Sequence, residues 1–271
     1  MEKGFGNPEL TGEARTLHHR QTNRRERAFR PCGCEKTLYG ERQIRVRPAS
    51  MWNEALMKAG KELTRFTYIG GTRMIYDISQ PVFGCEIYPG DSIPQKKQIC
   101  SIESGDLYNL TDFSMCTHNG THVDAPSHFL KDGKCIEEID LIRFIGPAFV
   151  AEHEGLLSGK DAKEILNKAE RASRDAVRRI LIKGKAVISK EAAEVFAAAG
   201  VFLLGNESQS VGPVEAPMEV HLILLRAEAV LLEGIRLAAV PEGVYHLNCA
   251  PILLNGCEGA PCRAILTDIT I

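Results

Sequence analysis

Three histidines and one aspartate lie within eleven residues near the middle of the chain: His118, His122, Asp124 and His128. Imidazole and carboxylate groups together are the usual ligands of a borderline divalent cation such as zinc or manganese. A glycine and a β-branched residue between the first two histidines, and a proline after the aspartate, favour a strand end that runs into a loop. The alternative is a polar loop whose histidines make ordinary hydrogen bonds. The number of ligand-type residues favours a metal site.

Two more residues of the same types come later in the chain. His221 begins an apolar stretch, and Glu233 ends another, Ala229 to Leu232. A carboxylate at the end of an apolar strand costs free energy unless it is paired, bound to a metal or solvated. A solvated glutamate is the common case, so this pair alone is weak evidence for a site.

The pattern His-x-Gly-Thr-His-x-Asp-x-Pro-x-His-Phe at residues 118–129 resembles the signature of the cyclase family of metal-dependent hydrolases. That family includes bacterial kynurenine formamidases and isatin hydrolases. An Asp-Ile-Ser segment at residues 77–79, a Pro-Gly-Asp turn at 89–91, and a glycine-rich turn followed by Arg-Ala near the C-terminus are similar too. The resemblance covers about residues 72–271. Leu222 departs from it, because relatives often carry a basic residue there.

The resemblance implies a ligand set for a divalent metal, zinc or manganese: His118, His122, Asp124, His221 and Glu233. Five ligands suffice for one ion with an open position, or for two ions bridged by Asp124. Such an ion makes water acidic enough to ionise near neutral pH and polarises a carbonyl group, so a formamide, lactam or ester can be hydrolysed. His128 corresponds to the proton shuttle of the family, and a histidine suits that task. The alternative makes His128 another ligand or a hydrogen-bond partner of Asp124.

Glu207 and Ser208 directly follow the apolar stretch Val201 to Gly205. Ligand sites in open α/β sheets lie at the carboxyl ends of strands. Relatives usually have an aspartate–serine pair here, so the resemblance suggests a substrate-binding role for both residues. An ordinary loop carboxylate is an equally good interpretation of Glu207.

The surrounding pattern predicts an α/β fold. Strands are expected over residues 74–80, 107–117, 144–150, 179–182 and 201–205, with helices over 161–179 and 190–199 and a short helix starting near Ala125. Ser189 and Gly200 are a suitable N-cap and C-terminal stop for the second helix, so residues 179–205 read as a parallel β-α-β unit. A hairpin with an Asn-Gly turn is expected at the C-terminus. The resemblance implies a swivelling β/β/α-type domain, with a mixed sheet partly curled into a barrel and helices outside.

The first 50 residues differ in composition from the rest. They hold eleven Lys or Arg against six Asp or Glu, whereas the remaining chain is acidic. Residues 1–71 are therefore predicted to be a basic, disordered extension, and residues 72–271 to be the cyclase-like hydrolase domain. A transit peptide and a nucleic-acid-binding arm are the alternatives, and the six acidic residues count against the first. A short amphipathic helix is expected within residues 51–70.

The composition is that of an ordinary globular protein, with 44% hydrophobic and 25% charged residues and a net charge of −2. Neither nucleic acid nor a membrane is an expected partner, and no apolar run is long enough to span a bilayer. Nine cysteines without a Cys-x-x-Cys pair predict reduced thiols and a cytoplasmic location. The resemblance implies a homodimer or homotetramer acting on a small-molecule substrate. The function predicted is hydrolysis of an aryl formamide or cyclic amide; a catalytically idle metal-binding protein and a lactone- or ester-specific hydrolase or cyclase are the alternatives.

Overall fold

The structure is a computed structural model that describes residues 55–58, 61–64, 74–213 and 215–269 of the chain. The chain divides into two units, residues 1–69 and 70–271. In the first unit, β1 (Ala55–Lys58) and β2 (Lys61–Thr64) form an antiparallel hairpin. The helix expected within residues 51–70 is therefore wrong where the chain is described. Gly60 is a poor helix former, which counts against a helix in this part of the sequence. Residues 1–54 lie outside the described part, so the predicted extension and its boundary at 71/72 stay predictions.

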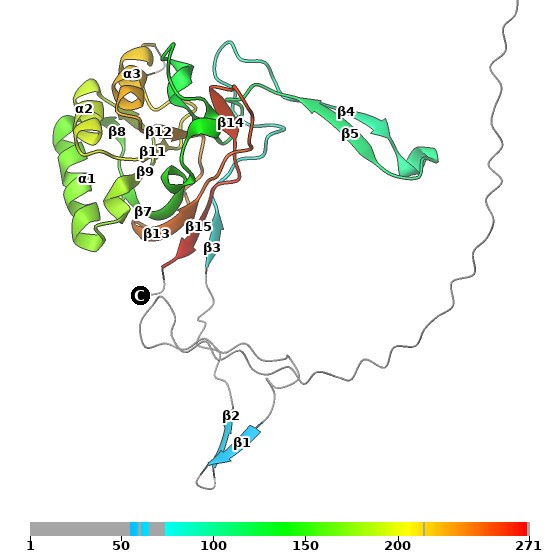
Figure 1. The fold of residues 1–271 in the computed structure, drawn as a ribbon, viewed down its shortest axis with the longest axis horizontal. Helices are drawn as coiled ribbons and strands as arrows, with labels where there is room; N and C mark the ends of the chain where they lie inside the picture. Colours follow the sequence, from blue (N-terminus) through cyan, green and yellow to red (C-terminus); the bar gives the residue numbers. More distant parts are fainter. Residues whose placement is uncertain (1–54, 59–60, 65–73, 214, 270–271) are drawn as a thin grey trace, which may run out of the picture. The chain divides into compact units, whose positions relative to one another are not determined.

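A mixed sheet of nine strands organises the second unit and curls into a half-barrel, as the α/β expectation requires (Figure 1). Its order is β14-β6-β12-β11-β9-β7-β13-β15-β3. The four middle strands are parallel, and the strands added on either side are antiparallel. The bounds are β3 Ile75–Asp77, β6 His122–Asp124, β7 Ile145–Glu152, β9 Arg179–Lys183, β11 Leu203–Asn206, β12 Val230–Glu233, β13 Gly243–Asn248, β14 Gly259–Pro261 and β15 Ile265–Asp268.

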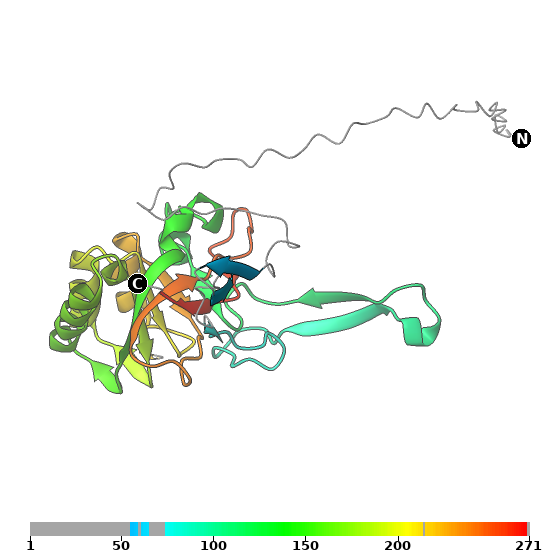
Figure 2. The ribbon, with the colours of Figure 1, turned by 90° about the horizontal axis from the view of Figure 1, so that it is seen from below.

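Three helices gather beside the parallel strands, α1 (Gly159–Ala172), α2 (Lys190–Ala198) and α3 (Met218–Arg226) (Figures 1 and 2). Along β9, Ile180 and Ile182 pack in the core cluster that contains the helices, whereas Leu181 between them packs in the cluster on the other face. This alternation is the period of a strand buried on both faces. The predicted β-α-β unit is confirmed, because β9 and β11 pair in parallel around α2. No helix in the described ranges is long and apolar enough to cross a membrane.

The helix caps follow the local sequence. The Ser189 hydroxyl accepts a hydrogen bond from the Ala192 N–H at 3.2 Å, as expected of an N-cap. Ser158 caps α1 in a capping box with Asp161. The helix expected to reach residue 179 ends earlier, at Ala172, and a short 3₁₀ helix, Ala176–Arg178, replaces its last turn. Ser173 at the C-cap is extended, which breaks the helical hydrogen-bond series.

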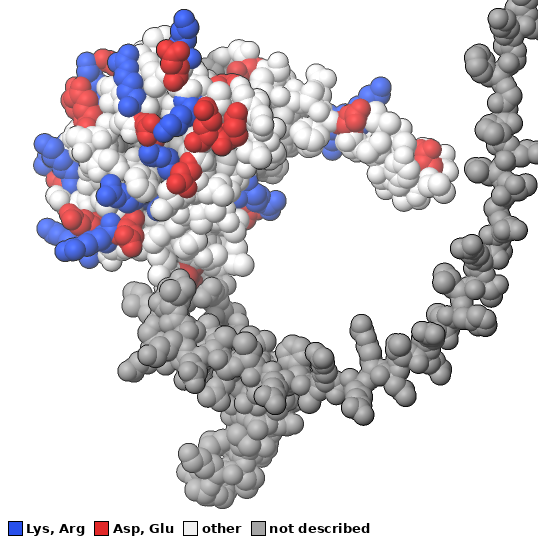
Figure 3. Space-filling view, viewed as in Figure 1, with Lys and Arg blue, Asp and Glu red and all other residues white. Residues whose placement is uncertain are grey.

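A long hairpin, β4 (Gln95–Cys100) and β5 (Leu110–Ser114), projects away from the sheet (Figures 1 and 2). The strand expected before the histidine segment is therefore present, but it pairs only with β4. Figure 3 shows acidic and basic side chains on the hairpin, with uncharged surface between them. The exposed apolar side chains of the hairpin are Ile99, Ile102, Leu107, Tyr108, Leu110 and Phe113. The hairpin was not foreseen as a separate feature.

The C-terminal strands close the sheet next to the histidine segment. β13 and β15 pair antiparallel, as the predicted hairpin requires, with Asn255 and Gly256 in its turn. The part between them, β14, pairs instead with β6.

Two short strands, β8 (Gly155–Leu157) and β10 (Ala186–Ile188), form a separate parallel pair. Further 3₁₀ turns span Ile102–Ser104, Pro126–His128, Ile136–Glu138 and Leu141–Arg143. The seven cysteines of the described residues are free thiols.

Candidate metal and active site

Strand β6 positions two of the candidate ligands. His122 and Asp124 are two residues apart on a strand, so they face the same side, while Val123 between them packs into the core. In the antiparallel pairing with β12, His122 lies directly opposite Glu233. Residues that face each other across an antiparallel pair have adjacent side chains. Sheet register alone therefore brings an imidazole and two carboxylates together, and all three side chains are buried.

The two remaining candidate ligands reach the same place from outside the sheet. His221 lies on α3, where its Nδ1 contacts the Pro217 carbonyl oxygen at 2.8 Å, and its Nε2 lies 3.3 Å from Glu233 Oε1. His118 Nδ1 lies 2.9 Å from Asp124 Oδ1. The ring of His118 also packs on Gly259 of β14, where a Cβ would come within 2.7 Å of its Cε1 atom. A side chain at position 259 would therefore displace this histidine.

The cluster has the properties of a cation site. His122 Nε2 lies 3.4 Å from both Asp124 Oδ1 and Glu233 Oε2, while its Nδ1 contacts the Gly120 carbonyl oxygen. His122 Nε2 and Asp124 Oδ2 are buried without a hydrogen-bond partner, although buried polar atoms nearly always have one. Two groups that share Asp124 each bring three ligand atoms within 4.8 Å of one another: His118, His122, Asp124 and Asp124, His221, Glu233. These residues fit one divalent cation, or two ions that share Asp124.

Electrostatics in the cluster favour ionised carboxylates. Burial acts to raise the pKa of Asp124, but the hydrogen bond and charge of His118 hold it well below its ordinary value. Burial acts to lower the pKa of His118, but the hydrogen bond to Asp124 and nearby carboxylates raise it to about 9. The pKa values of His122 and His221 are raised too, against burial, mainly by Glu233. A concentration of negative charge therefore attracts either protons or a metal ion to these rings, and the two compete for the same nitrogen atoms.

His128 differs from the other three histidines of the site. It lies in the short 3₁₀ helix Pro126–His128, which matches the short helix expected near Ala125. Its ring centroid is 4.1 Å from that of His118 and 6.2 Å from that of His221. Burial lowers its pKa, and the charges of His118 and His221 act in the same direction, opposed by Asp124. A lowered pKa favours the neutral form of the His128 ring, which is the form that can accept a proton.

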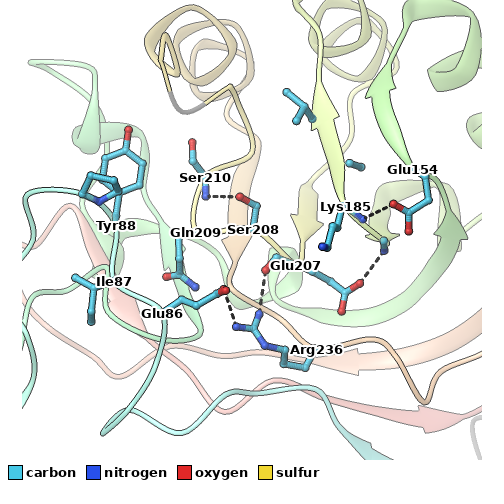
Figure 4. A pocket seen from close by; sticks show the side chains of 14 residues that line it. Glu86, Ile87, Tyr88, Glu154, Lys185, Glu207, Ser208, Gln209, Ser210 and Arg236 are labelled. Atoms are coloured by element: carbon cyan, nitrogen blue, oxygen red, sulfur yellow. Dashed lines mark hydrogen bonds and ion pairs between the residues drawn. The ribbon is translucent and has the colours of Figure 1, made fainter.

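A cavity of about 220 Å³ opens beside the cluster and is lined by Tyr88, Asp91, His118, His128, Phe129, Gln209, Ser210, Pro217, His221 and Glu233. A second cavity of about 760 Å³ shares Tyr88, Gln209 and Ser210 with it (Figure 4). The first holds His128 beside the candidate ligands, and the second provides room for a small organic molecule.

Glu207 and Ser208 line the larger cavity but not the smaller one. The Glu207 carboxylate accepts hydrogen bonds from the Gly184 N–H at 2.7 Å and the Leu237 N–H at 2.8 Å. The Ser208 hydroxyl accepts from the Ser210 N–H at 3.4 Å. The hydrogen bonds of both side chains are thus with backbone N–H groups, and the predicted substrate-binding role of the two residues stays a prediction.

Several residues of the site have no sequence signal. Glu258, in the glycine-rich turn before β14, contacts His118 Nε2 at 3.3 Å and accepts a hydrogen bond from the Thr117 hydroxyl at 2.6 Å. Arg236 donates to the Glu207 carbonyl oxygen and to Glu86, which joins two walls of the larger cavity (Figure 4). The partners in these contacts are up to 150 residues apart in the chain, so only the folded sheet reveals them.

The half-barrel and its buried cluster define an α/β protein with a His/Asp/Glu site suited to a divalent cation. The chain belongs to the cyclase family, whose model ("Putative cyclase") matches residues 74–213. It is 32% identical to a kynurenine formamidase of Erythrobacter litoralis over 209 residues, which are 73% of this chain and 95% of that protein. It is 33% identical to a kynurenine formamidase of Salinibacter ruber over 214 residues, 72% of this chain and 97% of the relative.

The fold also resembles a solved structure of isatin hydrolase A from Labrenzia aggregata, with a TM-score of 0.61 and 20% sequence identity. The similarity covers 72% of this chain and 93% of that structure. At this identity the comparison concerns the fold alone. It agrees with the architecture expected from the resemblance in the sequence.

Proposed function

We propose that this protein is a metal-dependent hydrolase that cleaves a carbonyl–nitrogen bond in an aryl formamide or a cyclic amide. The observation that carries the proposal is the convergence of five ligand-type side chains around two buried atoms without a hydrogen bond, His122 Nε2 and Asp124 Oδ2. Relatives named kynurenine formamidase, about 30% identical over nearly their whole length, support amide hydrolysis as the reaction.

We assign the roles as follows. The ligands are His118, His122, Asp124, His221 and Glu233, and the metal is zinc or manganese, as one ion or two. When bound, the metal would polarise the substrate carbonyl and make a water molecule acidic enough to ionise near neutral pH. His128, which lies in the cavity beside these residues and has a lowered pKa, would take a proton from the attacking water and return it to the leaving nitrogen.

The test is a hydrolysis assay with controlled metal content. The protein would be stripped with a chelator, reloaded with zinc or manganese, and offered formanilide, isatin and a phenyl ester. We expect amide hydrolysis above the uncatalysed rate only in the reloaded protein. His246 is exposed on β13, so a His246→Ala variant is a matched control that should behave as the wild type. A fully loaded protein that hydrolyses the ester alone would support the ester-specific alternative, and one that hydrolyses nothing would support the idle one.

We also propose that the protein is a cytoplasmic homo-oligomer. A two-stranded hairpin is marginally stable by itself in water, yet β4 and β5 project with their apolar side chains exposed. A second copy of the chain is the partner expected to cover them. Size-exclusion chromatography with light scattering would give the mass, and Leu110→Ser with Phe113→Ser should lower it. A monomeric wild-type protein would contradict the proposal.

A further inference from the structure

The three histidines of the candidate ligand set share one arrangement. In each ring one nitrogen faces the carboxylates of the cluster, and the other nitrogen contacts an oxygen atom outside the cluster. His122 directs Nε2 at the cluster, and its Nδ1 lies 3.1 Å from the Gly120 carbonyl oxygen. His221 does the same, with Nδ1 2.8 Å from the Pro217 carbonyl oxygen. Backbone oxygens two and four residues away therefore orient these two rings.

His118 has the reverse orientation and a different kind of outer partner. Its Nδ1 lies 2.9 Å from Asp124 Oδ1, and its Nε2 lies 3.3 Å from Glu258 Oε1. The outer contact of this ring is thus with a side-chain carboxylate, and it joins residues 140 positions apart in the chain. The orientation of His118 depends on a side chain that can be substituted, whereas the other two rings use the backbone.

The fold holds Glu258 beside this ring. The Glu258 carbonyl oxygen accepts a hydrogen bond from the Ala125 N–H at 2.8 Å, and the next residue, Gly259, lies opposite Asp124 in the pairing of β14 with β6. The Thr117 hydroxyl donates to Glu258 Oε1 at 2.6 Å, the same oxygen that faces His118. Sheet register and one hydroxyl group therefore place the carboxylate oxygen at the outer edge of the ring.

The chemistry of a histidine ligand gives this contact a role. A neutral imidazole carries one proton, and the nitrogen that binds a metal must be the one without it. An acceptor at the other nitrogen fixes the proton there and fixes the orientation of the ring. The Glu258 side chain is 42% exposed, so water screens its charge, and we expect the hydrogen bond to matter more than the charge.

We propose that Glu258 is a positioning residue of the metal site. It accepts the Nε2–H of His118 and so keeps His118 Nδ1 free of a proton and directed at the cluster. This inference rests on the metal site of the proposed function and assigns a role to a residue outside the predicted ligand set. The competing role for Glu258 is stabilisation of the turn before β14 alone.

The experiment measures the zinc affinity of the metal-free protein by competition with a chromophoric chelator. Glu258→Ala should raise the Kd for zinc roughly 10–100-fold, the usual cost of losing such a partner, and Glu258→Met, which has a similar length and no acceptor oxygen, should do the same. Glu258→Gln keeps an acceptor oxygen and should stay within about threefold of the wild type. If two equivalents of zinc bind, only one should weaken, because His118 belongs to one of the two ligand groups.

Glu137→Ala is the matched control for the turn. Glu137 is exposed and accepts a hydrogen bond from the Gly256 N–H at 2.8 Å, in the same turn as Glu258. No contact among the described residues links Glu137 to His118. The substitution therefore removes a hydrogen bond from the turn without touching the ring, and it should leave the zinc affinity unchanged.

The outcomes separate this inference from the proposed function. Wild-type affinity in Glu258→Ala and Glu258→Met would overturn the inference, and so would a loss in Glu258→Gln as large as theirs. An equal loss in Glu137→Ala would assign the effect to the turn and overturn it too. The proposed function would stand in all three cases. A wild type that binds no zinc would contradict the proposed metal site and the inference together. Thermal melting of each metal-free variant shows that it is folded.

Discussion

Glu207 and Glu233 occupy similar places in the fold and differ in their surroundings. Glu233 ends β12, Glu207 directly follows β11, and these strands are parallel neighbours. The Glu207 carboxylate is partly exposed and accepts two backbone N–H groups. The Glu233 carboxylate is buried, accepts one backbone N–H, that of Val211, and faces His122 and His221. Backbone N–H groups thus satisfy the hydrogen-bonding capacity of the Glu207 carboxylate. The Glu233 carboxylate lies instead among imidazole side chains, which can bind protons or metal ions.

The difference shows that position at the end of a strand does not make a carboxylate functional. Glu207 joins the loops that contain Gly184 and Leu237, so we expect its main contribution to be stability. In the proposed site Glu233 would be a metal ligand, because a buried carboxylate surrounded by imidazoles needs positive charge near it, from protons or from a metal ion. Substitutions at Glu233, His128 and Glu207 can test this contrast between a carboxylate that binds metal and one that stabilises the fold.

Glu233→Gln should lose most of the bound metal and with it nearly all turnover. The change removes the negative charge and leaves one weak acceptor beside His122 and His221. The loss should exceed the roughly 10–100-fold that removal of an outer partner of a metal ligand costs. Metal analysis and amide hydrolysis would be measured together, with Glu207→Gln as the matched control that keeps its metal. If Glu233→Gln stays fully loaded and active, the contrast between the two glutamates is wrong.

His128→Ala should keep the metal and lose roughly 10²–10⁴-fold in turnover on an amide, the usual contribution of a positioned acid or base. An activated ester has a leaving group that needs no proton, so the variant should be less impaired on the ester. Loss of metal together with activity would make His128 a ligand. Equal impairment on both substrates would rule out proton donation to the leaving group.

The pH dependence should follow the lowered pKa of His128. A general base must be neutral, and its activity falls as pH drops through its pKa. Because burial lowers this pKa below 6.5, kcat/KM should persist at pH values below 6.5, where an exposed histidine would already be protonated. The profile of His128→Ala should lack this acid limb. An acid limb in the wild type well above pH 6.5 would contradict the assignment.

Glu207→Gln should affect stability rather than chemistry. The amide keeps one acceptor oxygen, and its NH₂ group replaces the other and faces a backbone N–H. Loss of one satisfied pair costs about 1–3 kcal/mol, which lowers Tm by roughly 2–10 °C in a domain of this size. Glu154→Gln is the control, because Glu154 is exposed and accepts one longer bond, from the Lys185 N–H at 3.2 Å. Lost turnover at unchanged Tm in Glu207→Gln would give Glu207 a functional role.

The ligand-type residues could be singled out from the sequence because local patterns mark them. His122 and Asp124 alternate with an apolar residue on a single short strand, and Glu233 directly ends an apolar one. The parallel β-α-β unit is predictable for the same reason, since Ser189 and Gly200 mark the ends of its helix. Features that depend on pairing between distant segments are not predictable in this way.

Three particular features show where prediction from sequence ends. The contact of Glu258 with His118 exists because β14 pairs with β6, which no local pattern indicates. The hydrogen bond from Arg236 to Glu86 joins residues 150 positions apart in the chain. The helix expected within residues 51–70 is wrong, because residues 55–58 and 61–64 form an antiparallel strand pair. The helical spacing of apolar residues favoured a helix there, and the helix-breaking Gly60 was the signal against it.

The most direct test of the account is the metal content of the purified protein and of His122→Ala, measured by elemental analysis after dialysis. His122 Nε2 is the buried nitrogen without a hydrogen bond at the centre of the cluster, so its removal should affect binding most specifically. We expect about one or two equivalents of zinc or manganese in the wild type and in His246→Ala, and little metal in His122→Ala. Full occupancy in His122→Ala, or a wild type that neither carries nor takes up a divalent metal, would contradict it.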